Sequence, residues 1–145
     1  MTKDIISLIN EKLREMEKNL IFLKQVSQEI SKDNIKDDII RYWGIERGLQ
    51  ILIELVIDSA NIIISSTDIE KPPTYRKTIL KLSKIDVIPK KFAEELSKMA
   101  GFRNILVHDY AEVDEDIILE ILENKLDDFL KYINYINKWL KENYI

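Results

Sequence analysis

Residues 51–64 have the sequence ILIELVIDSANIII, in which ten of fourteen side chains are apolar. On an ideal helix these side chains point in nearly every direction, and a helix that is apolar all round is buried among other elements. We therefore predict a long central helix from about Lys36 to Ser65. A small bundle has few helices with which to cover it, so we expect a second copy of the chain to cover part of it.

A polar stripe interrupts the apolar circumference of this central helix. Its residues follow one another at steps of three and four, which places them on one helix face. They are Arg47, Gln50, Glu54, Asp58 and Asn61. The last three also break up the longest apolar stretch, so we do not expect it to span a membrane.

The region before the central helix predicts another long helix. From about Lys3 to Ile30 the apolar residues recur every three or four positions, which is the period of one helix stripe. Thr2 is suited to cap the start of this helix. Residues 31–34, with the sequence SKDN, predict a short break before the central helix.

The region after the central helix begins with a connector. The pair Pro72–Pro73 blocks helix formation, and Thr74 is suited to cap a short helix that ends near Ser83.

Two more helices are predicted in the rest of the chain. Pro89 fits the first turn of a helix that starts near Lys90 and that Gly101 ends or loosens. Asp114 is suited to cap the last helix, in which apolar residues again recur at steps of three and four. Together these helices predict an all-α, up-and-down bundle of four or five helices.

The composition fits a single soluble domain spanning residues 1–145. The chain is 46% hydrophobic and 33% charged, with three glycines and three prolines, fewer turn-forming residues than a many-stranded sheet needs. It has no cysteine, which excludes disulfides and thiolate metal sites and favours a reducing compartment. The first twenty residues carry charges throughout and lack the apolar core of a signal peptide, so we expect a cytoplasmic protein.

The charge is unevenly distributed, although the net charge is only −4. Residues 71–103 contain nine basic and three acidic residues, a net charge of +6, whereas residues 111–145 contain nine acidic residues and four lysines, a net charge of −5. A basic segment within an acidic chain can present a local surface for a polyanion such as RNA. The alternative is that both segments are ordinary solvated helix faces.

Residues 101–110, with the sequence GFRNILVHDY, contain the strongest candidate for a catalytic site. His108 is the only histidine and thus the one side chain whose unperturbed pKa, about 6.5, suits proton transfer near neutral pH. On an ideal helix Asn104 lies about 40° from His108, whereas Arg103 lies about 140° away. Either the helix breaks between Arg103 and His108, or a second copy of the chain completes the site.

The residue types in this stretch suit the chemistry of a phosphate ester. Arg103 offers a rigid fork of donors, Asn104 can orient a base or the imidazole ring, and Tyr110 supplies a phenol. The alternative is a structural role, which is common for a lone histidine near a helix end. We do not expect a metal site, because one histidine without cysteine makes a poor ligand set, and the sequence has no Gly-rich phosphate loop.

The stretch MAGFRNILVHDYAEVD, residues 99–114, resembles the signature of the HepT-like family, within the HEPN superfamily of small helical ribonucleases. The family pattern R-N-x-x-x-H-x-Y corresponds to Arg103, Asn104, His108 and Tyr110. The resemblance covers roughly residues 36–130. Within that range RYWGIERGLQILIELVIDSANIII is similar to the family's second helix, and PPTYRKTILKLSKIDVIPKKFAEELSKMA is similar to its middle section.

The resemblance implies an activity, an assembly and a partner. Members of the family are typically toxins that cut RNA without a metal ion, as homodimers in which two motifs face each other across a cleft. Each is typically paired with a minimal nucleotidyltransferase antitoxin. That antitoxin transfers AMP from ATP to the tyrosine that Tyr110 matches, which silences the toxin.

We therefore predict the toxin of a type VII-like toxin–antitoxin system, a metal-independent endoribonuclease without a cofactor, with Arg103, Asn104 and His108 as its catalytic residues. Glu54 and Asp58 either orient His108 or Arg103, or form a helix–helix salt bridge or polar seam. Two other functions remain open. One is a non-catalytic module of the same fold that binds nucleotides or docks a nucleotidyltransferase, and the other is a helical dimer with a structural role.

Overall fold

The computed structural model describes residues 1–108 and 115–144, and this part of the chain is helical, without a strand. Of Val107 and His108 only the backbone is described. The described helices are α1 (Lys3–Glu29), α2 (Ile39–Ser65), α3 (Tyr75–Lys84), α4 (Lys90–Ser97), α5 (Met99–His108), α6 (Glu115–Asn124) and α7 (Leu126–Tyr144). The fold is therefore the all-α bundle that the sequence predicts, built from more helices than the predicted four or five.

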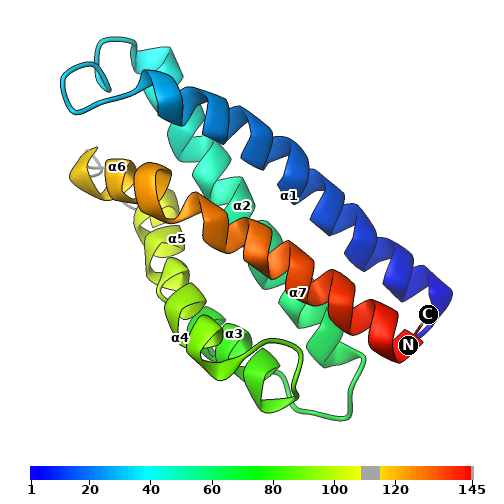
Figure 1. Cartoon of the computed structure of the whole chain (residues 1–145). Helices are drawn as coiled ribbons and strands as arrows, with labels where there is room; N and C mark the ends of the chain where they lie inside the picture. The colour runs from blue at the N-terminus through cyan, green and yellow to red at the C-terminus, as the bar shows by residue number, and fades with distance from the viewer. Residues whose placement is uncertain (109–114, 145) are drawn as a thin grey trace.

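The helix α2 occupies the centre of the bundle. The long helices α1 and α7 pack on one side of it, and the shorter helices α3, α4 and α5 form the other side (Figure 1). Contacts join α2 directly to α1, α3, α5 and α7. Consequently α5, which carries the predicted catalytic motif, lies against the central helix.

Side-chain caps set the starts of the first three helices. The Thr2 hydroxyl accepts a hydrogen bond from a first-turn amide at 3.2 Å, and the Thr74 hydroxyl accepts one at 3.1 Å, which confirms both predicted caps. The helix α2 begins at Ile39 and not at Lys36, because the Asp38 carboxylate caps it by accepting hydrogen bonds from two amides of its first turn.

Two of the predicted helices are each divided by a short break. α4 ends at Ser97 and α5 starts two residues later, so the break precedes Gly101, which lies inside α5. The amides of Lys98 and Gly101 each bond to a carbonyl three residues back, and such tighter turns interrupt an α-helix. The predicted last helix is divided at Lys125 into α6 and α7. Its predicted cap, Asp114, lies outside the described residues.

The middle of α2 is buried within the chain itself. Most of its side chains from Leu49 to Ile64 are covered by the helices that surround α2. The chain itself therefore covers most of the apolar circumference of α2, and the covering of the remainder by a second copy stays a prediction. Its exposed apolar side chains lie instead in its first turns, at Ile39, Ile40 and Trp43.

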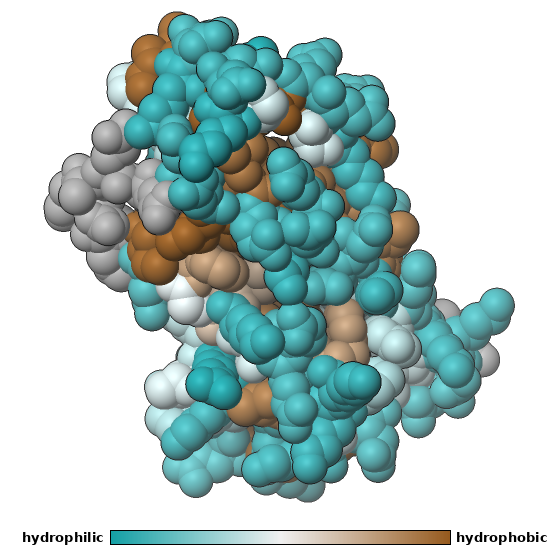
Figure 2. All heavy atoms as spheres, turned by 60° about the vertical axis from the view of Figure 1, so that its left-hand side comes forward, coloured by the Kyte–Doolittle hydropathy of each residue, from teal (hydrophilic) through white to brown (hydrophobic). Residues whose placement is uncertain are grey.

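Exposed apolar side chains also occur on α1, where Ile21 and Phe22 lie close to the turn that leads into α2. This end of the α1–α2 pair thus carries five of the exposed large hydrophobic side chains of the described chain. Elsewhere the surface is more polar, and Figure 2 shows one face that is mostly hydrophilic, with hydrophobic atoms gathered along its left-hand edge. The concentration at one end marks a candidate surface for contact with another molecule.

In the described part of the chain one helix, α2, is long and apolar enough to cross a membrane. However, 56% of its most apolar window is buried inside the bundle. A core helix surrounded by other helices is expected to be this apolar. The burial therefore accounts for the composition of α2 without a membrane.

A buried hydrogen bond joins α7 to α2. The hydroxyl groups of Tyr132 and Ser59 are 2.6 Å apart, and both side chains are inaccessible to solvent. Burial raises the pKa of the Tyr132 phenol well above its ordinary value, because the charged form would lose its hydration. The phenol is therefore neutral, and both hydroxyls are also hydrogen-bonded to the Val56 carbonyl oxygen, so these buried polar groups are satisfied.

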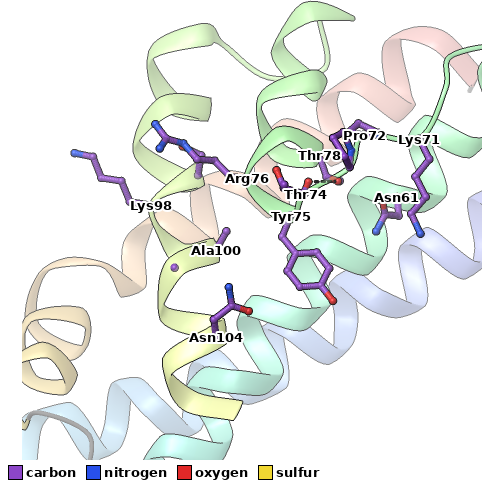
Figure 3. A pocket seen from close by; sticks show the side chains of 13 residues that line it. Asn61, Lys71, Pro72, Thr74, Tyr75, Arg76, Thr78, Lys98, Ala100 and Asn104 are labelled. Atoms are coloured by element: carbon purple, nitrogen blue, oxygen red, sulfur yellow. Dashed lines mark hydrogen bonds between the residues drawn. The ribbon is translucent and has the colours of Figure 1, made fainter. Parts of the chain in front are cut away.

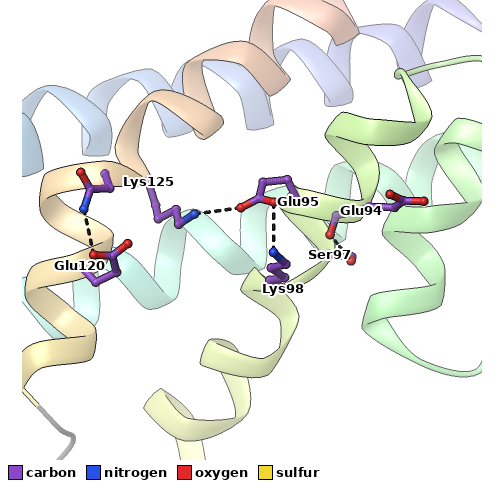
Figure 4. Close-up of polar contacts among 7 residues, drawn as sticks. Glu94, Glu95, Ser97, Lys98, Glu120 and Lys125 are labelled. Atoms are coloured by element: carbon purple, nitrogen blue, oxygen red, sulfur yellow. Dashed lines mark hydrogen bonds and ion pairs between the residues drawn. The ribbon is translucent and has the colours of Figure 1, made fainter.

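A second polar contact ties the α6–α7 junction to α4. The Lys125 ammonium donates to the Glu95 carboxylate at 2.9 Å, and Lys98 donates to its other oxygen at 3.1 Å (Figure 4). These hydrogen bonds lower the pKa of the Glu95 carboxyl, with that from Lys125 as the larger cause. All three residues lie at breaks or near helix ends, so the contact holds the two breaks next to each other.

Candidate functional site

Arg103 projects from α5 toward α2 and the start of α3. Its Nε atom lies 3.6 Å from Oε1 of Glu54, and its side chain is 19% exposed. The guanidinium carbon lies 4.9 Å from the centre of the Tyr75 ring, a distance suited to a cation–π contact. Residues from two other helices, α2 and α3, therefore fix the position of this arginine.

Glu54 is itself held by a neighbour on the polar stripe of α2. The Gln50 amide donates to Glu54 Oε1 at 3.2 Å. The stripe thus presents a fixed carboxylate to Arg103, and this pair fits both predicted arrangements, since it holds Arg103 and is also a salt bridge between α2 and α5. Asp58, the other predicted supporting residue, lines the same cleft as Glu54 and Arg103.

Two adjoining clefts lie beside this contact. The small cleft has a volume of about 390 Å³. It is lined by Glu54, Ile57, Asp58, Asn61, Lys71, Tyr75 and Arg103. The large cleft has a volume of about 770 Å³. It is lined by Asn61, Lys71, Pro72, Pro73, Thr74, Tyr75, Arg76, Thr78, Ser97, Lys98, Ala100, Gly101 and Asn104. Because Asn61, Lys71 and Tyr75 line both, the clefts form one continuous depression between α2, α3 and α5. Figure 3 shows the side chains that line its large cleft.

The depression carries part of the basic segment that the sequence predicts as a polyanion surface. Four of the nine basic residues between positions 71 and 103 line it, namely Lys71, Arg76, Lys98 and Arg103. Acidic side chains are confined to the small cleft, at Glu54 and Asp58. The large cleft therefore has a cationic lining that suits a phosphate group.

Asn61 is an unusual member of this lining. Its Oδ1 atom is buried and has no hydrogen-bond partner among the described residues. A buried acceptor without a partner costs roughly 1–3 kcal/mol. Such atoms are uncommon in folded proteins, and water or a ligand is one ordinary explanation for them.

The predicted catalytic residues are only partly described. Arg103 and Asn104 lie side by side in sequence on α5, with Arg103 at the small cleft and Asn104 at the large one. The helix α5 runs without a break to His108, whose side chain lies outside the described part. Tyr110 also lies outside the described residues. Because the helix does not break between Arg103 and His108, their separation of about 140° around the helix axis is retained.

Tyr75 is a site residue that the sequence analysis missed. The predicted Thr74 cap places Tyr75 on the first turn of α3, but a cap does not reveal which helix the next side chain faces. Its contact with Arg103 joins two segments that are far apart in the chain and depends on the packing of α3 against α5.

The described side chains offer no ready site for a metal ion. Among them, no three histidine, cysteine or carboxylate residues lie close enough together to bind one. The groups that the described depression does offer are guanidinium and ammonium donors, amides, an aromatic ring and two carboxylates. This set suits the binding of a phosphate ester and the stabilisation of its charge.

Comparison with known proteins relates this arrangement to a family. Residues 16–136 match the family model for HepT-like ribonucleases. An mRNA nuclease HepT from Shewanella oneidensis is 33% identical over 101 residues, which covers 70% of this chain and 76% of the relative. A tRNA nuclease HepT from Aphanizomenon flos-aquae is 26% identical over 133 residues, which covers 92% of this chain and 90% of the relative.

The structural comparison agrees with the sequence comparison. The solved structure of the tri-AMPylated Shewanella oneidensis HEPN toxin in complex with the MNT antitoxin superposes with a TM-score of 0.80 at 28% identity. The match covers 95% of this chain and 99% of that toxin. On the family match and these likenesses, the chain belongs to the HepT-like ribonuclease family.

Proposed function

We propose that this protein is a single-domain endoribonuclease, the toxin of a toxin–antitoxin pair, and that it cuts RNA in the cytoplasm at a site containing Arg103, Asn104 and His108. The observation that carries the proposal is the placement of Arg103. A glutamate and an aromatic ring hold its guanidinium at the edge of a cationic depression, in a chain of the HepT-like ribonuclease family.

The chemistry follows from what RNA and these side chains provide. The ribose 2′-oxygen attacks the adjacent phosphorus, while the bond from phosphorus to the 5′-oxygen breaks. His108 accepts the proton of the 2′-hydroxyl or donates one to the leaving 5′-oxygen. Arg103 stabilises the charge on the phosphorane, and Asn104 positions the phosphate or the imidazole. The products are a 2′,3′-cyclic phosphate and a 5′-hydroxyl, and no metal ion takes part.

The active form in this proposal is a homodimer. On the unbroken α5, positions 103 and 108 are about 140° apart around the helix axis, so a site that uses both residues is best completed by a second copy. The exposed Ile39, Ile40 and Trp43 at the start of α2 also favour association, since they are large apolar side chains that a contact would cover.

The proposed partner is a minimal nucleotidyltransferase antitoxin, and Tyr110 is the proposed acceptor of AMP. The support is the solved complex of an AMPylated HEPN toxin with its MNT antitoxin, to which this chain is similar. An AMP group two residues from His108 would bring a bulky adenosine and a negative phosphate to the site. The phosphate would compete with the RNA backbone for Arg103.

The proposal is tested by incubating the purified protein with RNA in the presence of EDTA. We expect cleavage to persist in EDTA and to disappear in Arg103→Ala and in His108→Ala. Arg14→Ala, which removes an exposed arginine from α1, serves as the matched control and should cut like the wild type.

The outcomes separate the proposal from its competitors. Normal cutting by His108→Ala would remove histidine from the mechanism, and loss of cutting in EDTA would require a metal ion. Absence of cutting by the folded wild-type protein on every RNA tested would favour the non-catalytic module that binds nucleotides or docks a nucleotidyltransferase.

A further inference from the structure

The large cleft has the dimensions and the chemistry of a ligand site separate from the catalytic arginine. Its volume of about 770 Å³ falls within the range of about 300–1,000 Å³ that is typical of small-molecule sites. Arg103 does not line it, whereas Asn104, the next residue, does. A ligand in the large cleft would therefore adjoin the proposed reaction centre at Asn104, away from Arg103.

Tyr75 provides an aromatic surface inside this cleft. Its side chain is 38% exposed although its ring contacts the guanidinium of Arg103. The ring borders both clefts, while Arg103 lines only the small one. In Figure 3 the ring projects between Asn104 on one side and Asn61 and Lys71 on the other, so part of it is open to the large cleft.

Polar groups without partners surround this aromatic surface. The Asn61 Oδ1 atom is buried and accepts no hydrogen bond from the described residues. Within the same part of the chain, Lys71 and Arg76 form no ion pair or hydrogen bond, unlike Lys98, which is bound to Glu95. Because the Asn61 Oδ1 atom is inaccessible, the groups available to a ligand around this aromatic ring are the two cations.

From this combination we infer that the large cleft is a binding subsite for one unpaired RNA nucleotide that flanks the scissile phosphate. Its base stacks on Tyr75, and its phosphate binds Lys71 and Arg76. The nucleotide must be unpaired, because a ring of this kind stacks on bases that are splayed out of a duplex. The inference rests on the proposed ribonuclease function and adds the substrate class, single-stranded RNA.

The test measures binding and not cleavage, so that it does not depend on catalysis. A short fluorescein-labelled single-stranded RNA is titrated with full-length His108→Ala protein, and its anisotropy gives Kd. Introducing Tyr75→Leu into this His108→Ala protein should weaken its binding to the RNA roughly 5- to 150-fold, the range expected for the loss of one stacked base. Tyr75→Phe keeps the ring and should bind as tightly as the parent. Tyr144→Leu, which removes a similarly exposed tyrosine from the end of α7, is the matched control.

Because Tyr75 also contacts Arg103, a second variant tests the cleft without touching that contact. Arg76 lines only the large cleft. Arg76→Gln should weaken RNA binding several-fold and reduce its salt dependence, since one phosphate contact is lost. Arg14→Gln on α1 is the control for removing a positive charge and should leave Kd unchanged.

The same titration with free mononucleotides identifies the ligand. RNA should bind more tightly than AMP, CMP, GMP or UMP. If mononucleotides bind as tightly as RNA with the same dependence on Tyr75, the cleft holds a free nucleotide and the inference is wrong. Equal RNA affinity of Tyr75→Leu, Tyr75→Phe and the parent also overturns it. Neither result contradicts the proposed ribonuclease function, which is wrong only if the wild-type protein does not cut RNA.

Discussion

The carboxylate of Glu54 lies 3.6 Å from Nε of the proposed catalytic Arg103. The Glu54 side chain is 33% exposed. Ion pairs that are partly exposed contribute about 0–1 kcal/mol, so this pair adds little to the stability of the fold. Its more specific effect is geometric, since it holds the guanidinium between α2 and the Tyr75 ring. We therefore regard Glu54 as a positioning residue.

Glu54→Gln separates this positioning role from substrate binding. We expect kcat for RNA cleavage to fall roughly 10- to 100-fold, since a misplaced catalytic group costs that much. RNA affinity should stay the same or increase, because the change removes a negative charge that repels phosphate. Steady-state kinetics with Glu17→Gln on α1 as control provides the measurement. A kcat equal to that of the wild type would mean that the pair is only a structural contact.

Tyr110 is the proposed residue at which the antitoxin controls the toxin. We expect coexpression with a cognate nucleotidyltransferase to add one or more AMP units to the intact mass, and Tyr110→Phe to abolish the addition. The modified protein should remain folded and fail to cut RNA, because the AMP phosphate competes for Arg103. An unchanged mass with an active partner, or addition at Tyr132 or Tyr135, would contradict this assignment.

Tyr132 couples stability to alkaline pH. Burial raises the pKa of its phenol in the folded state above the ordinary value of about 10. Above that pH the unfolded chain loses the proton while the folded chain retains it, so the free energy of unfolding should decrease as pH rises.

Tyr132→Phe should remove much of this alkaline decrease. Near neutral pH the variant should be about 1–2 kcal/mol less stable, because Ser59 loses its buried partner. Urea unfolding at a series of pH values measures both effects, with the more exposed Tyr144→Phe as control. An alkaline decrease as steep in Tyr132→Phe as in the wild type would assign it to other groups.

At the scale of the elements, local chemistry was predictable from sequence and packing was not. Thr2 and Thr74 start helices by hydrogen bonds within four residues, and both caps were predicted correctly. The breaks at Lys98 and Lys125 were missed, because neither position carries the glycine or proline that usually signals one. The extent to which its own chain covers α2 was not predictable either, since it depends on contacts between distant helices.

The same distinction between local chemistry and packing applies to the candidate site. Arg103 and Asn104 were predicted because they belong to a local motif, and the structure places both at the depression. Tyr75 and the opening between α2, α3 and α5 arise only when separate helices pack together. A single sequence contains no local signal for such a contact.

The glycines of α2 provide a test of how this helix packs against α1. A Cβ atom at Gly48 would lie 3.2 Å from Leu23 Cδ2, whereas one at Gly44 would have no atom within 4 Å. Gly44→Ala should therefore stabilise the protein by about 0.5–1 kcal/mol, the ordinary gain within a helix. Gly48→Ala should gain less or lose stability, because Leu23 must shift. Urea denaturation distinguishes the two, and an equal gain in both variants would show that the α1–α2 contact is not tight there.

At the scale of the whole molecule, the orientation of α5 is the decisive feature. The helix is continuous from Met99 to His108, so positions 103 and 108 of a single copy are about 140° apart around its axis. A catalytic site that needs both residues is then formed most simply from the arginine of one copy and the histidine of another. This is the central claim of the account.

The claim is tested most directly by RNA cleavage in a mixed dimer. One copy carries Arg103→Ala and the other carries His108→Ala, and two different affinity tags isolate the dimer that contains both. Such a dimer retains one intact arginine and one intact histidine on opposite copies. We predict that it cuts RNA in EDTA, although neither variant does so alone. A purified, folded mixed dimer that is as inactive as its two parents would contradict the shared site.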